Sequence, residues 1–255
     1  MKNTIAIIQA RTNSKRLPGK ILKKINNKSL ISWVVENTIK VRNLKKIIIA
    51  TTKNRSDDKL VDIIKSNYNF LDIYRGNANN VLKRFYNCSL KYKPKYIIRI
   101  TADDPLKDHN LIKKALKIIK KTNCDYCSNS IIQTYPDGAD VEVFKFSALK
   151  KTYKEAMLKI DKEHVTSYMI RNSSKFKLYN FKSKKNLKNY RFTVDTAKDL
   201  RFIKLLFKHI KNITNLNFVE ITKIISKKKF LLKFMDKKKH NYSYYKQLAL
   251  YKNAK

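Results

Sequence analysis

Gln9-Ala10-Arg11-Thr12-Asn13-Ser14-Lys15-Arg16-Leu17-Pro18-Gly19-Lys20 follows directly on the apolar run Ile5-Ala6-Ile7-Ile8. The apolar run predicts a buried β-strand, and the loop after it holds four cations, two small hydroxyl residues and a Pro-Gly turn. Such a loop gathers backbone N–H groups and positive charge at the end of a strand, an arrangement that suits a polyphosphate. The sequence therefore predicts an anion-binding loop in this part of the chain.

Helices and strands alternate in the segments that follow. Periodic apolar residues predict helices over 29–40, 57–66, 80–92 and 109–121, and apolar runs predict strands over 46–51, 71–74, 96–100 and 124–128. Strands that are apolar on both faces belong inside a sheet covered by helices. The pattern predicts an α/β fold with a doubly wound, mostly parallel sheet.

Beyond residue 140 the sequence predicts a smaller appended part. Strands are expected over 141–144, 175–181 and 190–194, and helices over 147–158, 162–171, 197–210 and 218–234. We divide the chain into a main domain over 1–215, which contains a smaller inserted part over 140–190, and a basic C-terminal helix and tail over 216–255. The tail from residue 236 onward has no clear period, and we expect it to be loosely ordered.

The charge of the chain is extreme. Its 255 residues include 59 basic and 19 acidic ones, which gives a formal net charge of +40. Such a charge by itself favours nucleic acid or an anionic surface as the partner. The lysines are nevertheless spread along the whole chain and interleave with the helical apolar pattern, so we expect no dedicated nucleic-acid partner.

No stretch has the roughly 18 consecutive apolar residues of a membrane span, and the N-terminus lacks a signal-peptide pattern. Both observations predict a cytoplasmic protein.

Polar residues gather in the loops that follow the predicted strands. These loops begin at Gln9, Thr51, Arg75, Thr101 and Asn129. Ligands of doubly wound sheets bind at this carboxyl edge. The chain has only three glycines, and each marks one of these loops as a place where a side chain has no room: Gly19, Gly76 and Gly138.

Aspartates in two places are candidates for a metal site. Asp103 and Asp104 come directly after the strand over 96–100, where a carboxylate is positioned to hold Mg²⁺ together with substrate phosphates. An aspartate before Pro105 can equally start a turn and cap the next helix. Asp195 ends a predicted strand, where it can be an N-cap, a second metal ligand or both, since the two interpretations are compatible.

A further group of acids lies in the loop over 135–142. Asp137, Asp140 and Glu142 contact a metal, a cation or polyhydroxyl groups, or they belong only to a Pro-Asp-Gly turn. His164, next to Glu163, is either part of a general base pair or a residue on a helix surface.

With these loops in view, the sequence resembles the cytidylyltransferase family that contains the acylneuraminate and 3-deoxy-manno-octulosonate cytidylyltransferases, and most closely its spore-coat polysaccharide biosynthesis protein F type. The motifs that carry the resemblance occur in family order over about residues 4 to 210: Ile8-Gln9-Ala10-Arg11, Ser14-Lys15-Arg16-Leu17-Pro18-Gly19-Lys20, Ala50-Thr51-Thr52, Arg75-Gly76, Asn80-Val81-Leu82-Lys83-Arg84-Phe85, Arg99-Ile100-Thr101-Ala102-Asp103-Asp104-Pro105-Leu106, Tyr135-Pro136-Asp137-Gly138-Ala139-Asp140-Val141-Glu142-Val143-Phe144, Glu163-His164-Val165-Thr166 and Phe192-Thr193-Val194-Asp195-Thr196.

The resemblance implies the nucleotide-diphospho-sugar transferase fold and a Mg²⁺-dependent nucleotidyltransferase. Such an enzyme transfers CMP from CTP to an acidic or phosphorylated sugar and releases pyrophosphate, here for surface or flagellar glycan biosynthesis. Relatives often dimerise through the inserted part, so the resemblance also implies a homodimer.

The resemblance assigns roles to individual residues in four groups. The catalytic residues are Arg11, Arg16, Lys20 and Asp103. Asp103 and Asp195 bind the metal. The nucleotide is bound by Gln9, Ala10, Arg11, Ser14, Gly19, Lys20, Thr51, Gly76, Arg84, Thr101 and Ala102. The acceptor is bound by Asn129, Asp137, Asp140, Glu142 and His164.

Two positions depart from the family pattern. Ala102 and Asp104 stand where the family usually has Gly and Cys, so the choice between Asp103 and Asp104 as ligand stays open, although the alignment favours Asp103.

Two other functions also stay open. One is a glycosyltransferase of the same fold that uses a nucleotide sugar, and such enzymes usually carry an Asp-x-Asp motif. The other is a basic, non-catalytic protein that binds nucleic acid or an anionic surface.

Overall fold

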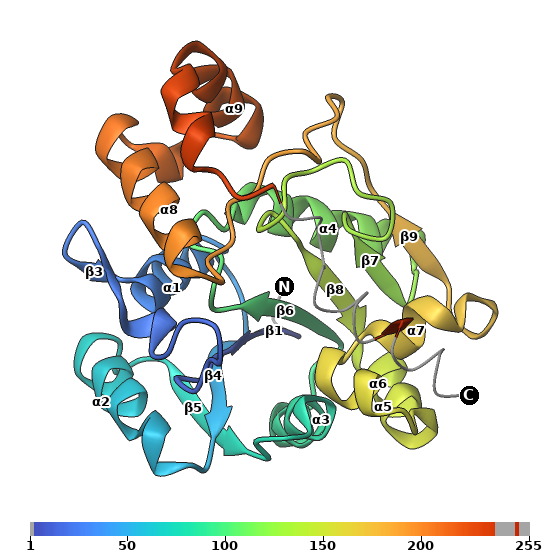
Figure 1. Ribbon diagram of the computed structural model, residues 1–255. Coiled ribbons are helices and arrows are strands. Elements are labelled where there is room, and N and C mark those ends of the chain that lie inside the picture. Colours follow the sequence, from blue (N-terminus) through green and yellow to red (C-terminus); the bar gives the residue numbers. More distant parts are fainter. Residues whose placement is uncertain (1–2, 238–247, 250–255) are drawn as a thin grey trace.

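The computed structural model describes residues 3–237, 248 and 249 (Figure 1). The prediction of a loosely ordered tail over 236–255 falls almost wholly outside these residues. Among the described residues, none of the helices combines the length and the apolar character that crossing a bilayer requires.

The centre of the molecule is a seven-stranded sheet with the strand order β5-β4-β1-β6-β8-β7-β9. Its strands are β1 (Thr4–Gln9), β4 (Lys46–Thr52), β5 (Asp72–Gly76), β6 (Tyr96–Thr101), β7 (Tyr126–Ser128), β8 (Glu142–Lys145) and β9 (Leu178–Asn180). β8 runs antiparallel to both of its neighbours, β6 and β7, and every other pairing in this sheet is parallel. The prediction of a mostly parallel sheet is therefore confirmed.

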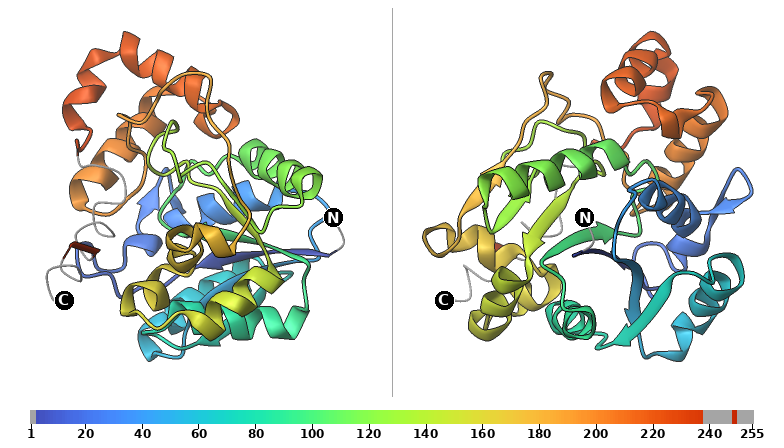
Figure 2. Two further views of the ribbon diagram at one scale, coloured as in Figure 1. Left: turned by 90° about the vertical axis from the view of Figure 1, so that its right-hand side faces the viewer. Right: turned by 180° about the vertical axis from the view of Figure 1, so that it is seen from behind.

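Helices cover both faces of the sheet (Figures 1 and 2). They are α1 (Leu30–Ile39), α2 (Asp58–Asn67), α3 (Val81–Tyr92), α4 (His109–Thr122), α5 (Phe146–Glu155), α6 (Lys159–His164), α7 (Ser167–Arg171), α8 (Ala197–His209) and α9 (Phe218–Lys227). Because side chains alternate along a strand, Ala6 and Ile8 join the core beneath α1, α2, α4, α8 and α9, whereas Ile5 and Ile7 face α3, α5 and α7. The predicted α/β architecture is thus confirmed, with one apolar core on each face.

The C-terminal helix α8 packs beside α1 at one end of the molecule, and α9 lies on the far side of α8 (Figures 1 and 2). Trp33 of α1 and Phe207 of α8 bring their ring centroids within 4.8 Å. This packing places the start of α8, and therefore Asp195 and Thr196, over the carboxyl ends of β1 and β6.

Three expectations about local structure are wrong. The helix predicted over 162–171 is interrupted by Val165, whose φ of 57° lies in the left-handed region. The segment predicted as a strand over 190–194 forms only an isolated bridge between Asp137 and Arg191. The helix predicted over 218–234 ends at Lys227 and continues as a separate 3-10 helix over Lys229–Phe234.

A short hairpin was not predicted. Its strands, β2 (Lys24–Ile25) and β3 (Lys28–Ser29), pair antiparallel around Asn26 and Asn27. Both asparagines have positive φ, as the tightest hairpin turns require. The hairpin leads into α1, whose N-cap is Ser29 as expected.

Candidate active site

A single buried carboxylate holds the loop after β1 against the end of β4. Asp57 Oδ1 accepts hydrogen bonds from the backbone N–H and from the hydroxyl of Thr12, both at 2.7 Å. Asp57 Oδ2 accepts from the backbone N–H of Thr52 at 3.2 Å and from the Thr52 hydroxyl at 2.5 Å. Burial by itself raises the pKa of Asp57, but the hydrogen bonds from Thr52 and Thr12 outweigh it, and the pKa lies below its usual value. Asp57 was not singled out from the sequence, because an aspartate at this position is typical of the start of a helix.

Replacing Asp57 by asparagine should destabilise the fold by about 2 kcal/mol at neutral pH, because an amide accepts hydrogen bonds at only one of its two ends. Since the folded-state pKa is lowered, ionised Asp57 stabilises the protein above its unfolded pKa of about 3.9, and this contribution is lost as the pH falls through the folded-state pKa. In urea unfolding at about pH 7 and pH 3, Asp57→Asn should therefore lose less stability on acidification than the wild type.

Asp62→Asn is the matched control, because Asp62 is exposed on the same helix, α2. It should behave as the wild type does at both pH values. An equal loss on acidification for Asp57→Asn and for the wild type would contradict the role given to Asp57.

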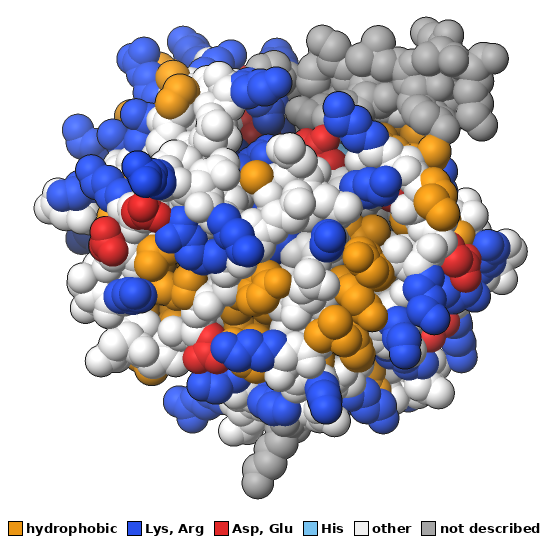
Figure 3. Space-filling view, turned by 90° about the horizontal axis from the view of Figure 1, so that it is seen from below, with side chains coloured by type: hydrophobic (Ala, Val, Ile, Leu, Met, Phe, Trp, Pro, Cys, Tyr) orange, Lys and Arg blue, Asp and Glu red, His pale blue; other side chains and the backbone are white. Residues whose placement is uncertain are grey.

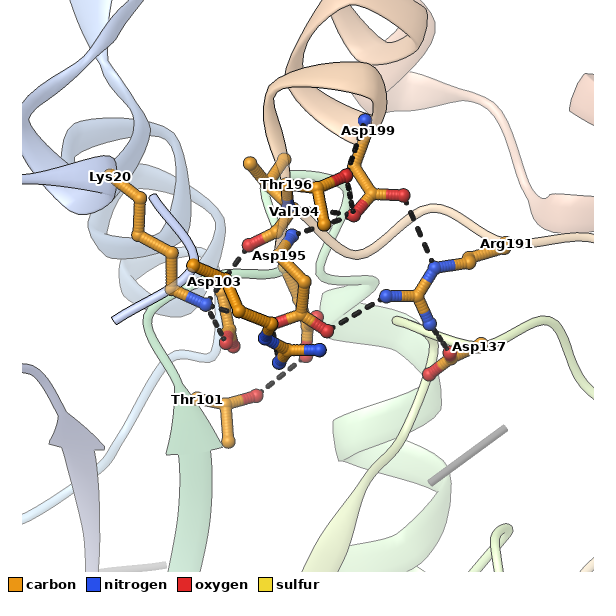
Figure 4. A network of polar contacts seen from close by, with 11 residues as sticks. Lys20, Thr101, Asp103, Asp137, Arg191, Val194, Asp195, Thr196 and Asp199 are labelled. Atoms are coloured by element: carbon orange, nitrogen blue, oxygen red, sulfur yellow. Dashed lines mark hydrogen bonds and ion pairs between the residues drawn. The ribbon is translucent and has the colours of Figure 1, made fainter. Parts of the chain in front are cut away.

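Lys20 lies between the two aspartates that were expected to bind metal (Figure 4). Its ammonium donates to Asp103 Oδ2 at 2.7 Å, to Asp195 Oδ1 at 3.0 Å and to the carbonyl oxygen of Val194 at 3.0 Å. Burial by itself lowers the pKa of Lys20, but the two carboxylates outweigh it and the pKa is raised. Gly19, with a φ of 64°, turns the chain so that Lys20 points into this cluster. The structure thus brings together Lys20 from the loop after β1, Asp103 from the loop after β6 and Asp195 from the segment before α8.

Asp195 has two further cationic partners. Arg16 Nη2 lies 2.7 Å from Asp195 Oδ1, and Arg191 Nη2 lies 2.7 Å from Asp195 Oδ2. Burial by itself raises the pKa of Asp195, and Lys20 and the two arginines lower it below its usual value. The N-cap of α8 is Thr196, which forms a capping box with Asp199. The side chain of Asp195 is therefore not used as a cap and faces the cluster.

Arg191 was not singled out from the sequence, although it is the centre of this network (Figure 4). Its guanidinium forms ion pairs with Asp137, with Asp195 at 2.7 Å and with Asp199 at 3.3 Å. Its side chain is 6% exposed. Burial by itself lowers the pKa of Arg191, but the three carboxylates raise it above its ordinary value. Its three acidic partners come from separate segments, with Asp137 in the loop over 135–142, Asp195 before α8 and Asp199 in the first turn of α8.

Gly138 allows the loop over 135–142 to approach the segment that carries Asp195. Its φ is 93°, and a Cβ atom built on it would lie 2.7 Å from the backbone nitrogen of Thr193 and 2.8 Å from the carbonyl carbon of Phe192. Both contacts are with backbone atoms, which cannot rotate away.

Replacing Gly138 by alanine should destabilise the protein by about 1–3 kcal/mol and also lower its activity, because the backbone that leads to Asp195 must move. Gly19→Ala is the comparison, because that position also has a positive φ but no atom lies within 4 Å of its added Cβ. Thermal unfolding should show the larger loss for Gly138→Ala. Equal losses would mean that the positive φ, and not the contact with the 192–193 backbone, makes glycine necessary.

The two neighbouring aspartates 103 and 104 have different surroundings. Asp104 Oδ2 accepts hydrogen bonds from the Thr101 hydroxyl at 2.6 Å and from the buried ammonium of Lys107 at 2.9 Å. Lys107 also donates to the carbonyl oxygen of Asp140 at 2.9 Å. Asp104 therefore ties the end of β6 to the loop over 135–142, and Asp103 is the aspartate that joins the Lys20 cluster.

A second buried network lies across the neighbouring strands β6, β8 and β7. Glu142 forms an ion pair with Arg99 and accepts hydrogen bonds from the Tyr126 hydroxyl at 2.8 Å and from the Thr166 hydroxyl at 2.5 Å. Arg99 Nε donates to Gln9 Oε1 at 3.3 Å. Both oxygens of Glu142 are thus engaged by protein groups. The positive φ at Val165 is explained by this contact, since it turns Thr166 toward the sheet.

The remaining predicted residues fall into two groups. Asn129 is buried, donates to the carbonyl oxygen of Ala139 at 2.9 Å and accepts from Val141 N–H at 2.8 Å, so its side chain shapes the loop over 135–142. Arg84 is buried against Gly76, and burial together with nearby Arg11 lowers its pKa to about 10. Of the other positions, Ala10, Thr51 and Ala102 are buried, Ser14 and His164 are half-buried, and Arg11 is exposed. Their assignment to nucleotide or acceptor stays a prediction.

The donor set can be compared with what a metal ion needs. In the part of the chain that the structure describes, no three His, Cys, Asp or Glu side chains come together as a metal-binding group. Mg²⁺ is usually held by one or two carboxylates together with substrate phosphates and water, and not by a cage of protein ligands. Asp103 and Asp195, which share the Lys20 ammonium, fit that requirement.

The family model for cytidylyltransferases matches residues 5–253 of the sequence. The chain belongs to the cytidylyltransferase family. It is 37% identical over 225 residues to an uncharacterised protein of Methanocaldococcus jannaschii, a match that covers 88% of this chain and 90% of the relative. It is 29% identical over 215 residues to the spore coat polysaccharide biosynthesis protein SpsF of Bacillus subtilis, over 81% of this chain and 87% of SpsF.

A solved cytidylyltransferase from Leptospira borgpetersenii resembles this cytidylyltransferase in structure. The TM-score is 0.84 at 26% sequence identity, and the match covers 90% of this chain and 96% of the other. In this chain the parallel core is β5-β4-β1-β6, with the antiparallel β8 beside it. In this cytidylyltransferase the Lys20 cluster lies at the carboxyl ends of β1 and β6, the edge at which such sheets bind ligands.

Proposed function

We propose that this cytidylyltransferase transfers CMP from CTP to an acidic or phosphorylated sugar and releases pyrophosphate. The observation that carries the proposal is the cluster of Lys20, Asp103 and Asp195. It combines a cation on the predicted phosphate loop with two carboxylates on separate segments, which is what a triphosphate with a divalent cation requires. Membership of the family supports the nucleotidyl transfer itself.

The residues of the chain stabilise charge and position the reactants. An acceptor oxygen attacks the α-phosphorus of CTP; the new P–O bond forms as the bond to the β-phosphate breaks, and pyrophosphate leaves. Negative charge grows on the leaving group, and Arg11, Arg16 and Lys20 bind it there. Asp57 holds the loop that carries these cations in place.

Asp103 and Asp195 would hold Mg²⁺. Bound there, the ion supplies positive charge that neutralises the phosphate oxygens. Arg191 fixes the orientation of Asp195 through the ion pair at 2.7 Å and is a positioning residue. Asp137 supports Arg191 from the other side.

The acceptor is proposed to carry negative charge, like the sugar acid in the name of a relative, the 3-deoxy-manno-octulosonate cytidylyltransferase of Chlamydia pneumoniae, which is 29% identical over 46% of this chain. The likeness to a spore coat polysaccharide biosynthesis protein supports a role in the synthesis of surface or flagellar glycans. We do not propose a nucleic-acid partner, although the net charge is +40. On the face shown in Figure 3, the basic side chains are dispersed among apolar and uncharged ones and form no single stripe.

Pyrophosphate release tests the proposal. The protein is incubated with CTP, UTP, ATP or GTP and with a panel of acidic and phosphorylated sugars in the presence of Mg²⁺. Release is expected with CTP and one acceptor class and is expected to fall when Mg²⁺ is chelated. Release of a nucleotide from a nucleotide sugar, without pyrophosphate from any nucleotide, would instead indicate a glycosyltransferase.

A further inference from the structure

The ammonium of Lys20 occupies the position between the two proposed metal ligands. It contacts one oxygen of Asp103 at 2.7 Å and one oxygen of Asp195 at 3.0 Å. The carbonyl oxygen of Val194, at 3.0 Å, completes three oxygen contacts around the nitrogen. The Lys20 side chain is only 12% exposed, so the cation is enclosed by these groups.

Both carboxylate oxygens of Asp195 are already in contact with cations. Arg16 contacts the same Asp195 oxygen as Lys20, at 2.7 Å, and Arg191 contacts the other oxygen, also at 2.7 Å. Of these three cations only Arg191 has other acids, Asp137 and Asp199, as partners, whereas Lys20 and Arg16 lie directly on the oxygens of Asp103 and Asp195 that a divalent cation would need. A divalent cation that approached would meet like charges at short distance, where repulsion is strong even after screening by the protein.

A triphosphate would change this balance. Lys20 and Arg16 lie on the loop over 9–20, which has the backbone and the charge to bind phosphates. The lysine side chain is a flexible four-carbon stem that carries a point charge, so its ammonium can move by a few ångströms at small cost. Once phosphate oxygens bind the two cations, Asp103 and one oxygen of Asp195 become available.

We infer that Lys20 takes the place of the divalent cation in the nucleotide-free protein and leaves it only when the triphosphate binds. The divalent cation then binds together with the nucleotide and not before it. This inference rests on the proposed function, because it takes Asp103 and Asp195 as the metal ligands. It adds a second role for Lys20, which excludes the metal until the triphosphate binds.

Binding of Mn²⁺ to the nucleotide-free protein tests the inference. Mn²⁺ prefers the same oxygen ligands as Mg²⁺ and is detected by electron paramagnetic resonance. Lys20→Met should bind Mn²⁺ about tenfold or more tightly than the wild type, because the competing charge is gone. Lys20→Arg, which keeps a charge, should stay close to the wild type. Lys24→Met removes an exposed lysine from the same region and should not change Mn²⁺ affinity.

The double variant Lys20→Met with Asp195→Asn should lose the gain, which would assign the new affinity to this cluster. The inference is overturned if Lys20→Met gains no affinity, or if the nucleotide-free wild type already binds Mn²⁺ as tightly as the variant. A second measurement needs no variant: Mn²⁺ alone should not raise the melting temperature of the wild type, and a rise would also overturn the inference. None of these outcomes depends on turnover, so pyrophosphate release by the wild type tests the proposed function separately.

Discussion

Replacing Asp103 by asparagine should slow pyrophosphate release from CTP by about a hundredfold to a thousandfold, the usual cost of removing one preorganised charge contact at a transition state. Asparagine has nearly the same shape as aspartate, but it removes the charge that faces Lys20 at 2.7 Å and with it one of the two proposed ligands of Mg²⁺. The rate should be measured at saturating CTP and acceptor, with the melting temperature recorded alongside to show that the fold is intact.

Asp108→Asn is a matched control for this change. Asp108 lies five positions further along and is the N-cap of α4, a position at which asparagine is as good as aspartate. It should therefore retain both stability and turnover. Unchanged pyrophosphate release in Asp103→Asn would remove the metal assignment, and an equal loss in both variants would point to a general effect of charge.

Arg191→Met should destabilise the protein by about 3–5 kcal/mol, since removing one partner of a buried ion pair leaves the other charge buried and unpaired. Here Asp137 and Asp199 lose a cationic partner, and Asp195 keeps only Arg16 and Lys20. The free energy of unfolding in urea measures the loss. Turnover should also fall in samples that are still folded, because Asp195 is no longer held on the Arg191 side.

Arg42→Met makes the same chemical change at an exposed position and should alter the free energy of unfolding by less than about 0.5 kcal/mol. A similarly small effect of Arg191→Met would show that the three acids do not depend on this guanidinium. Asp137→Asn combined with Arg191→Met should recover part of the stability, because one of the three acids around the missing guanidinium is then neutral.

The parallel part of the sheet was predictable because its strands carry an unusually clear signal. β1, β4 and β6 are apolar on both faces, and only a strand between two layers of helices tolerates that pattern. The hairpin β2–β3 was not predictable, because its strands have two residues each and no alternation. The break at Val165 was not predictable either, since a β-branched residue with positive φ is set by the distant contact of Thr166 with Glu142.

The site divides in the same way. Lys20 and Asp103 could be brought together from the sequence because parallel strands end at the same edge of the sheet, and Asp195 followed from its resemblance to a family motif. Arg191 and Asp57 could not, because each acts between segments whose proximity depends on the final packing. The sequence also left the choice between Asp103 and Asp104 open, whereas contact with Lys107 shows that Asp104 has a structural partner.

The Lys20 cluster joins residues that lie 175 positions apart in the chain, from the loop after β1 to the segment before α8. A ribosome makes the chain from its N-terminus, so β1, β4, β5 and β6 leave the exit tunnel long before Asp195 does. During that interval Lys20 and Asp103 are both present in the nascent chain, but Asp195, which contacts Lys20 in the folded protein, is not. A nascent chain therefore acquires its complete site only in the last stage of its synthesis, after the parallel half of the sheet has already been made.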